Sequence, residues 1–140
     1  VGKVNCIQSV DSVKLAGEIS RLCVRDGLTM DVLVEVNIGR EENKGGVDPE
    51  HLVEFIEQIR VLPGIHVSGL MAIPPICGDK KILCRYFSAM KQYFVDIKGK
   101  SMDNVDMVCL SMGMSSDFSE AIECGATMVR VGSSLFGARL

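Results

Sequence analysis

Short apolar strands alternate with amphipathic helices along the whole of this 140-residue chain, and this alternation limits the folds open to it. Apolar residues at every second position predict strands, whereas a spacing of three or four residues predicts helices. A strand–helix–strand repeat is typical of a parallel sheet, because each helix returns the chain to the edge where the next strand begins. The expected strands cover residues 4–10, 30–38, 66–73, 106–111 and 127–131. We therefore expect an α/β fold with five parallel strands.

Capping residues and helix breakers delimit the four helices between these strands. The expected boundaries are Asp11 to Gly27, Asp48-Pro49 to Pro63-Gly64, a start at Asp79, and Ser116 to Gly125. A closed (β/α)₈ barrel needs eight strands. The five strands therefore form either a small open doubly wound sheet or the last five-eighths of a barrel, and the pattern alone does not decide between them.

Composition and charge exclude several classes of protein. A net charge of −3, with lysines and arginines scattered, predicts no nucleic-acid partner. No apolar run approaches the roughly 20 residues of a membrane helix, so we expect a soluble protein without a membrane partner. The six cysteines show no metal-ligand spacing, which favours reduced, buried thiols, an intracellular location and no metal site. The chain begins at Val1, which suggests a processed or truncated piece of a longer protein.

The last strand carries an arginine that alternation places opposite its valines. Val129 and Val131 share one side, and Arg130 lies on the other, two residues before Gly132. A buried arginine needs a partner because its desolvation is costly. Arg130 therefore forms either a structural ion pair, for example with Glu35, or a contact to a ligand.

The preceding strand also ends in small and hydroxyl residues. Alternation places Val108 and Leu110 on one side and Cys109 and Ser111 on the other, before the turn at 112–115. Glycines and serines at two consecutive strand ends can hold a phosphate, as the loops after strands seven and eight of barrels frequently do. The alternative is an ordinary turn with helix-capping serines.

Other polar residues give weaker signals. Glu35 and Asn37 share one side of the second strand, where they either line the interior or are satisfied core polar groups. Lys44 in the following loop is either a ligand contact or a solvated lysine, and Met71 suits the core. We assign no role to His51 or His66. No Ser/His/Asp triad, metal-ligand cluster or P-loop is found, so no catalytic residue is assigned.

Five motifs occur in one order along the whole chain. They are Gln8-Ser-Val-Asp-Ser12, Val36-Asn-Ile38 with Asn43-Lys44, Gly69-Leu-Met-Ala-Ile-Pro74, Leu110-Ser-Met-Gly-Met-Ser115, and Val129-Arg-Val-Gly132 with Phe136-Gly-Ala-Arg139. Together they resemble the pyridoxal 5′-phosphate homeostasis protein family. The resemblance implies a TIM barrel of the alanine racemase N-terminal type, of which this chain holds about the last five βα units, strands 4 to 8.

The same resemblance implies a cofactor site for pyridoxal 5′-phosphate. Ser115, Gly132 and Ser133 would hold the phosphate, and Arg130 would approach the pyridine nitrogen. An arginine there disfavours protonation of that nitrogen and weakens the ring as an electron sink. The other residues assigned to the site are Met114, Asn37 and Met71.

One departure from the family pattern concerns the covalent anchor. The family binds the cofactor as a Schiff base to a lysine on the first barrel strand, and no lysine here occupies a matching position. We therefore expect residues 1–140 to be a single domain, the C-terminal part of the barrel without its first strands. Lys44 as a substitute amine is a hypothesis.

The function implied is to bind, buffer and deliver the cofactor in the cytoplasm, without a reaction of its own. The small-molecule cofactor is the expected partner, and the full-length form is expected to be a monomer. The alternative from another class is an amino-acid racemase dependent on the same cofactor, which resembles a longer chain with a second domain. A third interpretation is a phosphate-binding barrel fragment unrelated to this cofactor.

Overall fold

The computed structural model describes residues 1–137 and contains one parallel sheet whose strands lie in chain order. The strands are β1 (Cys6–Val10), β2 (Met30–Glu35), β3 (Ile65–Met71), β4 (Val105–Met114) and β5 (Met128–Arg130). A doubly wound sheet reverses its winding, so its strands do not follow chain order. The order β1-β2-β3-β4-β5 therefore excludes that alternative and confirms the barrel interpretation.

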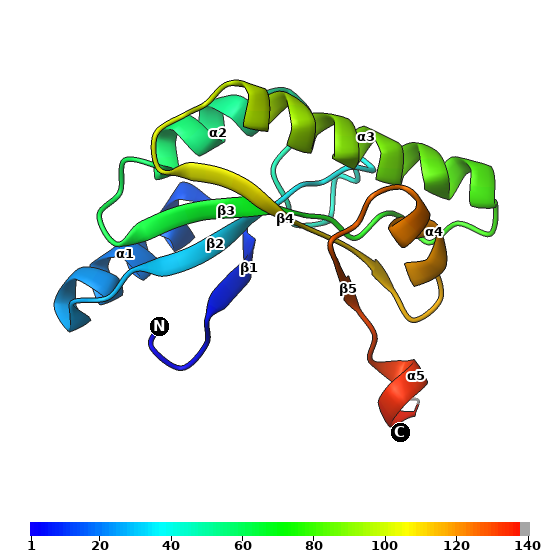
Figure 1. Cartoon of the computed structure of the whole chain (residues 1–140), viewed down its shortest axis with the longest axis horizontal. Helices are drawn as coiled ribbons and strands as arrows, with labels where there is room; N and C mark the ends of the chain where they lie inside the picture. The colour runs from blue at the N-terminus through cyan, green and yellow to red at the C-terminus, as the bar shows by residue number, and fades with distance from the viewer. Residues whose placement is uncertain (138–140) are drawn as a thin grey trace.

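Most of the helices lie on the outside of a curved half-barrel, and the last helical turn follows the end of β5 near the C-terminus (Figure 1). They are α1 (Val13–Asp26), the 3₁₀ turn η1 (Pro49–His51), α2 (Leu52–Ile59), α3 (Lys80–Gly99), α4 (Phe118–Glu123) and the single turn α5 (Ser133–Phe136). The concave side of the sheet stays open between β1 and β5 (Figure 1). Within residues 1–137, no helix has both the length and the apolar character that crossing a membrane requires.

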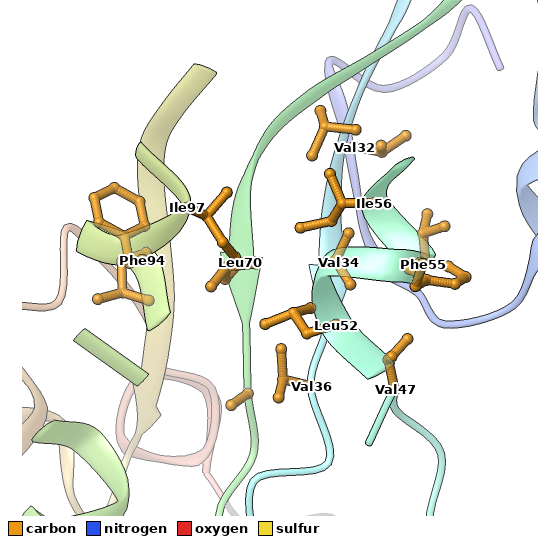
Figure 2. Packing of buried hydrophobic residues seen from close by; sticks show 14 of the residues in the cluster. Val32, Val34, Val36, Val47, Leu52, Phe55, Ile56, Leu70, Phe94 and Ile97 are labelled. Atoms are coloured by element: carbon orange, nitrogen blue, oxygen red, sulfur yellow. The ribbon is translucent and has the colours of Figure 1, made fainter. Parts of the chain in front are cut away.

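The main core fills the space between the convex side of the sheet and the helices. Figure 2 shows Val32 and Val34 of β2 beside Ile56 of α2, and Leu70 of β3 beside Ile97 of α3. These five side chains are fully or almost fully buried. The predicted alternation in β2 is confirmed on this side, because every second residue reaches the helix layer.

An irregularity in β4 interrupts its regular pairing with β3. Val67 pairs with Val105, but Gly69 pairs with Cys109, so β4 contains two more residues than β3 over this interval. Val108 is 65% exposed, while Leu110 is fully buried, so the two residues that alternation places on one side differ in burial. A Cβ on Gly69 would lie 1.8 Å from the Cys109 carbonyl oxygen, so this close approach of the backbones requires glycine.

The first helix is capped by a different residue from the one predicted. Ser12 Oγ accepts the Leu15 N–H at 3.2 Å, whereas Asp11 Oδ2 accepts the Gly46 N–H at 3.2 Å and so holds the loop after β2. The prediction that Asp11 caps the first helix was therefore wrong. The predicted caps at Asp48 and Asp79 are confirmed, each with a backbone N–H two residues ahead.

The thiols are free, as expected, but most are not buried. Cys23 alone of the six is buried, and the other five are partly exposed. The expectation of buried thiols was therefore wrong for five positions.

Candidate functional site

The ends of β4 and β5 lie side by side and are joined through Ser115. Its Oγ atom accepts the Gly132 N–H at 3.1 Å and the Ser134 N–H at 3.3 Å. The two small-residue strand ends singled out in the sequence therefore form one structure. Arg139, part of the last motif, lies outside the described residues.

A cavity of about 920 Å³ opens at this junction. Six of the residues that line it are Met114, Ser115, Ser116, Arg130, Gly132 and Ser133. Its described lining contains no carboxylate, histidine, lysine or cysteine. Hydroxyls and one guanidinium suit the binding of an anion such as a phosphate better than acid–base chemistry.

Gly113 allows this junction to form. Its φ is 98°, and a Cβ at this position would lie 2.6 Å from the Ala121 Cβ and 3.1 Å from the Phe118 Cα. A side chain would therefore push α4 away from the end of β4. α4 leads from the end of β4 to the start of β5, so its close packing against β4 fixes the Ser115 loop at the end of β4.

Arg130 is held across the concave side of the sheet. Its Nη1 donates to Ser111 Oγ at 2.5 Å, and its Nη2 donates to the Ala72 carbonyl, just past β3, at 3.0 Å. Burial lowers the pKa of Arg130, an effect that the nearby Glu35 and Asp117 charges oppose. The guanidinium stays charged, because an arginine is not deprotonated in proteins.

The alternative of an ion pair between Arg130 and Glu35 is not what the structure shows. Among the described residues, Arg130 hydrogen-bonds a hydroxyl and a carbonyl, and Glu35 acts on it only through its charge. Burial and the charge of Asp11 raise the pKa of Glu35, while Arg130 lowers it. Arg130 is therefore not neutralised by a bonded carboxylate.

Gln8 extends this arrangement from the opposite side of the half-barrel. Ser111 Oγ donates to Gln8 Oε1 at 2.7 Å, and Gln8 Nε2 approaches Met128 Sδ at 3.2 Å. Gln8 therefore links β1 to β4 and β5 across the open concave side. Sequence reasoning missed this contact. The alternation did place Ser111 and Arg130 on the sheet's inner side, but it carried no information on which residue of β1 would reach them.

Two other predicted site residues lie elsewhere. Asn37 donates to the Glu41 carbonyl at 2.8 Å and accepts the Glu41 N–H at 3.0 Å, so its amide holds the loop after β2. Lys44 pairs with Glu41 at 2.9 Å. Both line a separate small cavity of about 170 Å³ with Glu35. The structure therefore does not bring Asn37 or Lys44 into the cavity at Ser115.

Met71 lies beside the Arg130 network. It pairs in register with Ser111 and with Glu35, and it is 5% exposed. Leu70 next to it faces the helices, so Met71 lies on the concave side.

No candidate metal centre is found within residues 1–137. No group of three or more His, Cys, Asp or Glu side chains in this range is arranged to bind a metal ion.

Comparison with known proteins agrees with this geometry. The chain matches the family described as "Alanine racemase, N-terminal domain" over residues 2–140. It is 45% identical over 139 residues to the pyridoxal phosphate homeostasis protein of Aquifex aeolicus, covering 99% of this chain and 60% of that protein. It is 40% identical over 131 residues to the protein of the same name from Helicobacter pylori, covering 93% of this chain and 56% of that protein.

Solved structures show the same fold. PipY of Synechococcus elongatus, in the structure with pyridoxal 5′-phosphate bound, superposes with a TM-score of 0.86 at 30% identity, covering 98% of this chain and 63% of PipY. An alanine racemase from Clostridium difficile superposes with a TM-score of 0.74 at 18% identity, covering 96% of this chain and 36% of the racemase, a likeness of fold alone. The chain thus spans about 60% of the length of the first of these relatives. On sequence and structure together, the chain belongs to the alanine racemase N-terminal domain family.

Proposed function

We propose that this chain binds pyridoxal 5′-phosphate in the cavity between the ends of β4 and β5. The phosphate would lie against Ser115, Gly132 and Ser133, with Met114 at the cavity wall and Arg130 toward the pyridine nitrogen. The observation that carries the proposal is the junction itself, where Ser115 bonds the backbone after β5 beside a charged, fixed arginine. The PipY structure with the cofactor bound and the names of the curated relatives support it.

The residues present fit this cofactor. Ser115 Oγ already accepts two N–H groups, so its own proton is free to be donated to an oxygen in the cavity. Ser116 and Ser133 add two hydroxyls. Arg130 uses two of its five N–H donors in bonds to Ser111 and Ala72. The cavity volume of about 920 Å³ lies within the range usual for small-molecule sites.

The role proposed is to buffer and deliver the cofactor in vitamin B6 homeostasis, without a reaction of its own. The cofactor, when bound, supplies an aldehyde and an electron-accepting ring. Arg130 is a permanent cation with no hydrogen-bond acceptor, so a proton on a neighbouring ring nitrogen would be repelled and protonation there is disfavoured. The described lining holds the ligand but offers no group to move a proton, which supports a carrier over a racemase.

The remaining parts of the proposal concern the whole protein. We place residues 1–140 as one domain, the C-terminal part of a barrel whose earlier strands carry the covalent anchor. We also place the full-length form in the cytoplasm as a monomer.

Equilibrium dialysis of the chain tests the proposal, with absorbance used to quantify the retained ligand. We expect the chain to retain pyridoxal 5′-phosphate and to retain pyridoxal at least tenfold more weakly, because the cavity binds chiefly the phosphate. Each charge-assisted hydrogen bond to the phosphate contributes about 1.5–3 kcal/mol. Arg130→Ala weakens retention, whereas the matched control Arg21→Ala, an exposed residue paired with Glu18 on α1, leaves it unchanged.

Two results would contradict the proposal. Equal retention of the phosphorylated and unphosphorylated compounds would mean that the junction does not bind the phosphate. Unchanged retention and an unchanged absorbance spectrum in Arg130→Ala would remove Arg130 from it.

A further inference from the structure

One stripe of α3 faces α4 and the residues after it. Lys80, Cys84 and Ser88 follow one another at four-residue intervals and so lie on the same side of the helix. Lys80 Nζ pairs with Glu120 Oε1 of α4 at 2.8 Å. Ser88 Oγ lies 4.0 Å from the Sγ of Cys124, the residue that ends α4. Figure 1 shows α4 beside α3.

Two thiols meet between these contacts. Cys124 Sγ donates to the Cys84 carbonyl oxygen at 3.9 Å, and its thiol lies near enough to that of Cys84 to raise the pKa of Cys84. Both are partly exposed, in contrast to the buried Cys23. The Lys80–Glu120 pair, one turn before each thiol, keeps the two helices aligned. A small solute can therefore reach two thiols that are already adjacent.

We propose that Cys84 and Cys124 form a reversible disulfide that fastens the end of α4 to α3. The oxidant is a low-molecular-weight disulfide such as glutathione disulfide. One cysteine thiolate attacks a sulfur of the oxidant, and one glutathione leaves as a thiolate and takes up a proton. The second cysteine thiolate then attacks the mixed disulfide and releases the second glutathione. Two protons and two electrons leave the cysteines, and one oxidant molecule becomes two thiols.

The surroundings of Cys84 determine how fast this proceeds. Partial desolvation, the neighbouring Cys124 thiol and the charges of Glu120 and Glu123 raise the pKa of Cys84. Little Cys84 thiolate is present at neutral pH, and its fraction grows as the pH rises. We expect slow oxidation that accelerates with pH.

The link would restrict the cavity at the strand ends. α4 connects the Ser115 loop to β5, and Cys124 lies four residues before Met128. A covalent bond from Cys124 to α3 therefore limits the movement of α4 relative to β4. The expected consequence is a higher thermal midpoint of the oxidised chain, which returns to its starting value on reduction. This inference does not depend on which ligand the cavity binds.

Peptide mapping of the whole chain after incubation with glutathione disulfide tests the proposal. Remaining thiols are alkylated, and cleavage after Lys, Arg and Glu separates Cys84, in 82–85, from Cys124, in 124–130, and from Cys109. We expect these two peptides joined, with the mass of two hydrogens lost, and separated by dithiothreitol. Cys77→Ser, a nearby thiol outside the pair, is the control and leaves the link intact.

The variants Cys84→Ala and Cys124→Ala each remove the link, and two variants keep the test valid if one of them fails to fold. A stable mixed disulfide with glutathione at Cys84 that never resolves onto Cys124 would overturn the proposal. A preferred link between other cysteines would overturn it equally.

Discussion

His66 joins the amino ends of three neighbouring strands and makes the folded chain sensitive to pH. Its Nδ1 lies 2.6 Å from Asp31 Oδ1 of β2, and its Nε2 lies 2.8 Å from Asp106 Oδ2 of β4. The two ring nitrogens can donate hydrogen bonds at the same time only in the imidazolium form. The bond to Asp31, helped by Asp106, therefore raises the pKa of His66 against the opposing effect of burial.

The sign of the pH dependence follows from that shift. A raised pKa in the folded state means that the folded chain binds the proton more tightly, so the stabilisation is complete below the unfolded pKa, about 6.5. It is lost as the pH rises through the folded pKa. The slope cannot exceed about 1.4 kcal/mol per pH unit for a single proton.

The size of the effect is limited by solvent. The His66 side chain is 27% exposed, but those of Asp31 and Asp106 are 51% and 70% exposed. Hydrogen bonds to charged groups contribute about 1.5–3 kcal/mol when protected, and exposed ion pairs under 1 kcal/mol. We expect about 1–2 kcal/mol for the two bonds together, between these limits.

Urea unfolding followed by circular dichroism measures this difference. The free energy of unfolding should fall by about 1–2 kcal/mol between about pH 6 and pH 8, a range that ends before most thiols ionise. His66→Gln should remove the decline. His51→Gln is the matched control and should retain it, because His51 contacts only the exposed Glu54, at 3.7 Å, among the ion pairs of residues 1–137. A flat profile in the unmodified chain, or the same decline in His66→Gln, would refute the reasoning.

Two further predictions concern the folding of the sheet. Ile56→Ala should lower the free energy of unfolding by about 2–5 kcal/mol, because the Ile56 side chain is fully buried against the sheet. The control Ile76→Ala, at a fully exposed residue, should change the free energy of unfolding by less than about 0.5 kcal/mol. Gly69→Ala should lower the free energy of unfolding by about 3 kcal/mol or more, because the new Cβ would clash with the Cys109 carbonyl. The control Gly78→Ala should leave the free energy of unfolding almost unchanged, because a Cβ there meets no other atom. Chemical denaturation measures both pairs, and similar losses in a variant and its control would contradict the packing described.

Local signals predicted the elements well and the caps less well. Asp48 and Asp79 precede their helices in sequence and cap them in the structure. Asp11 stands next to Ser12, and both can cap, but the loop at Gly46 takes the Asp11 carboxylate. Which of the two residues caps α1 therefore depends on Gly46, 35 positions away from Asp11, and no local sequence pattern includes that residue.

The candidate site was predicted in part. Parallel topology alone implies that consecutive strand ends meet at one edge, and the bonds from Ser115 to Gly132 and Ser134 show that they do. The cofactor roles of Ser115, Gly132, Ser133 and Arg130 stay predictions. The family resemblance assigned Asn37 to the same site, but its amide is occupied by the Glu41 backbone.

The sequence by itself determined the number and order of the strands and the helices that connect them, because hydrophobic periodicity is a property of neighbouring residues. Periodicity left open whether the sheet is part of a barrel, and the tertiary structure decided it, since the answer depends on which strands pair. The same holds for the Gln8–Ser111 bond, the His66 bridge and the Cys84–Cys124 contact. Each joins residues 35 to 103 positions apart, and the curvature and register of the sheet, not any periodicity, bring them together.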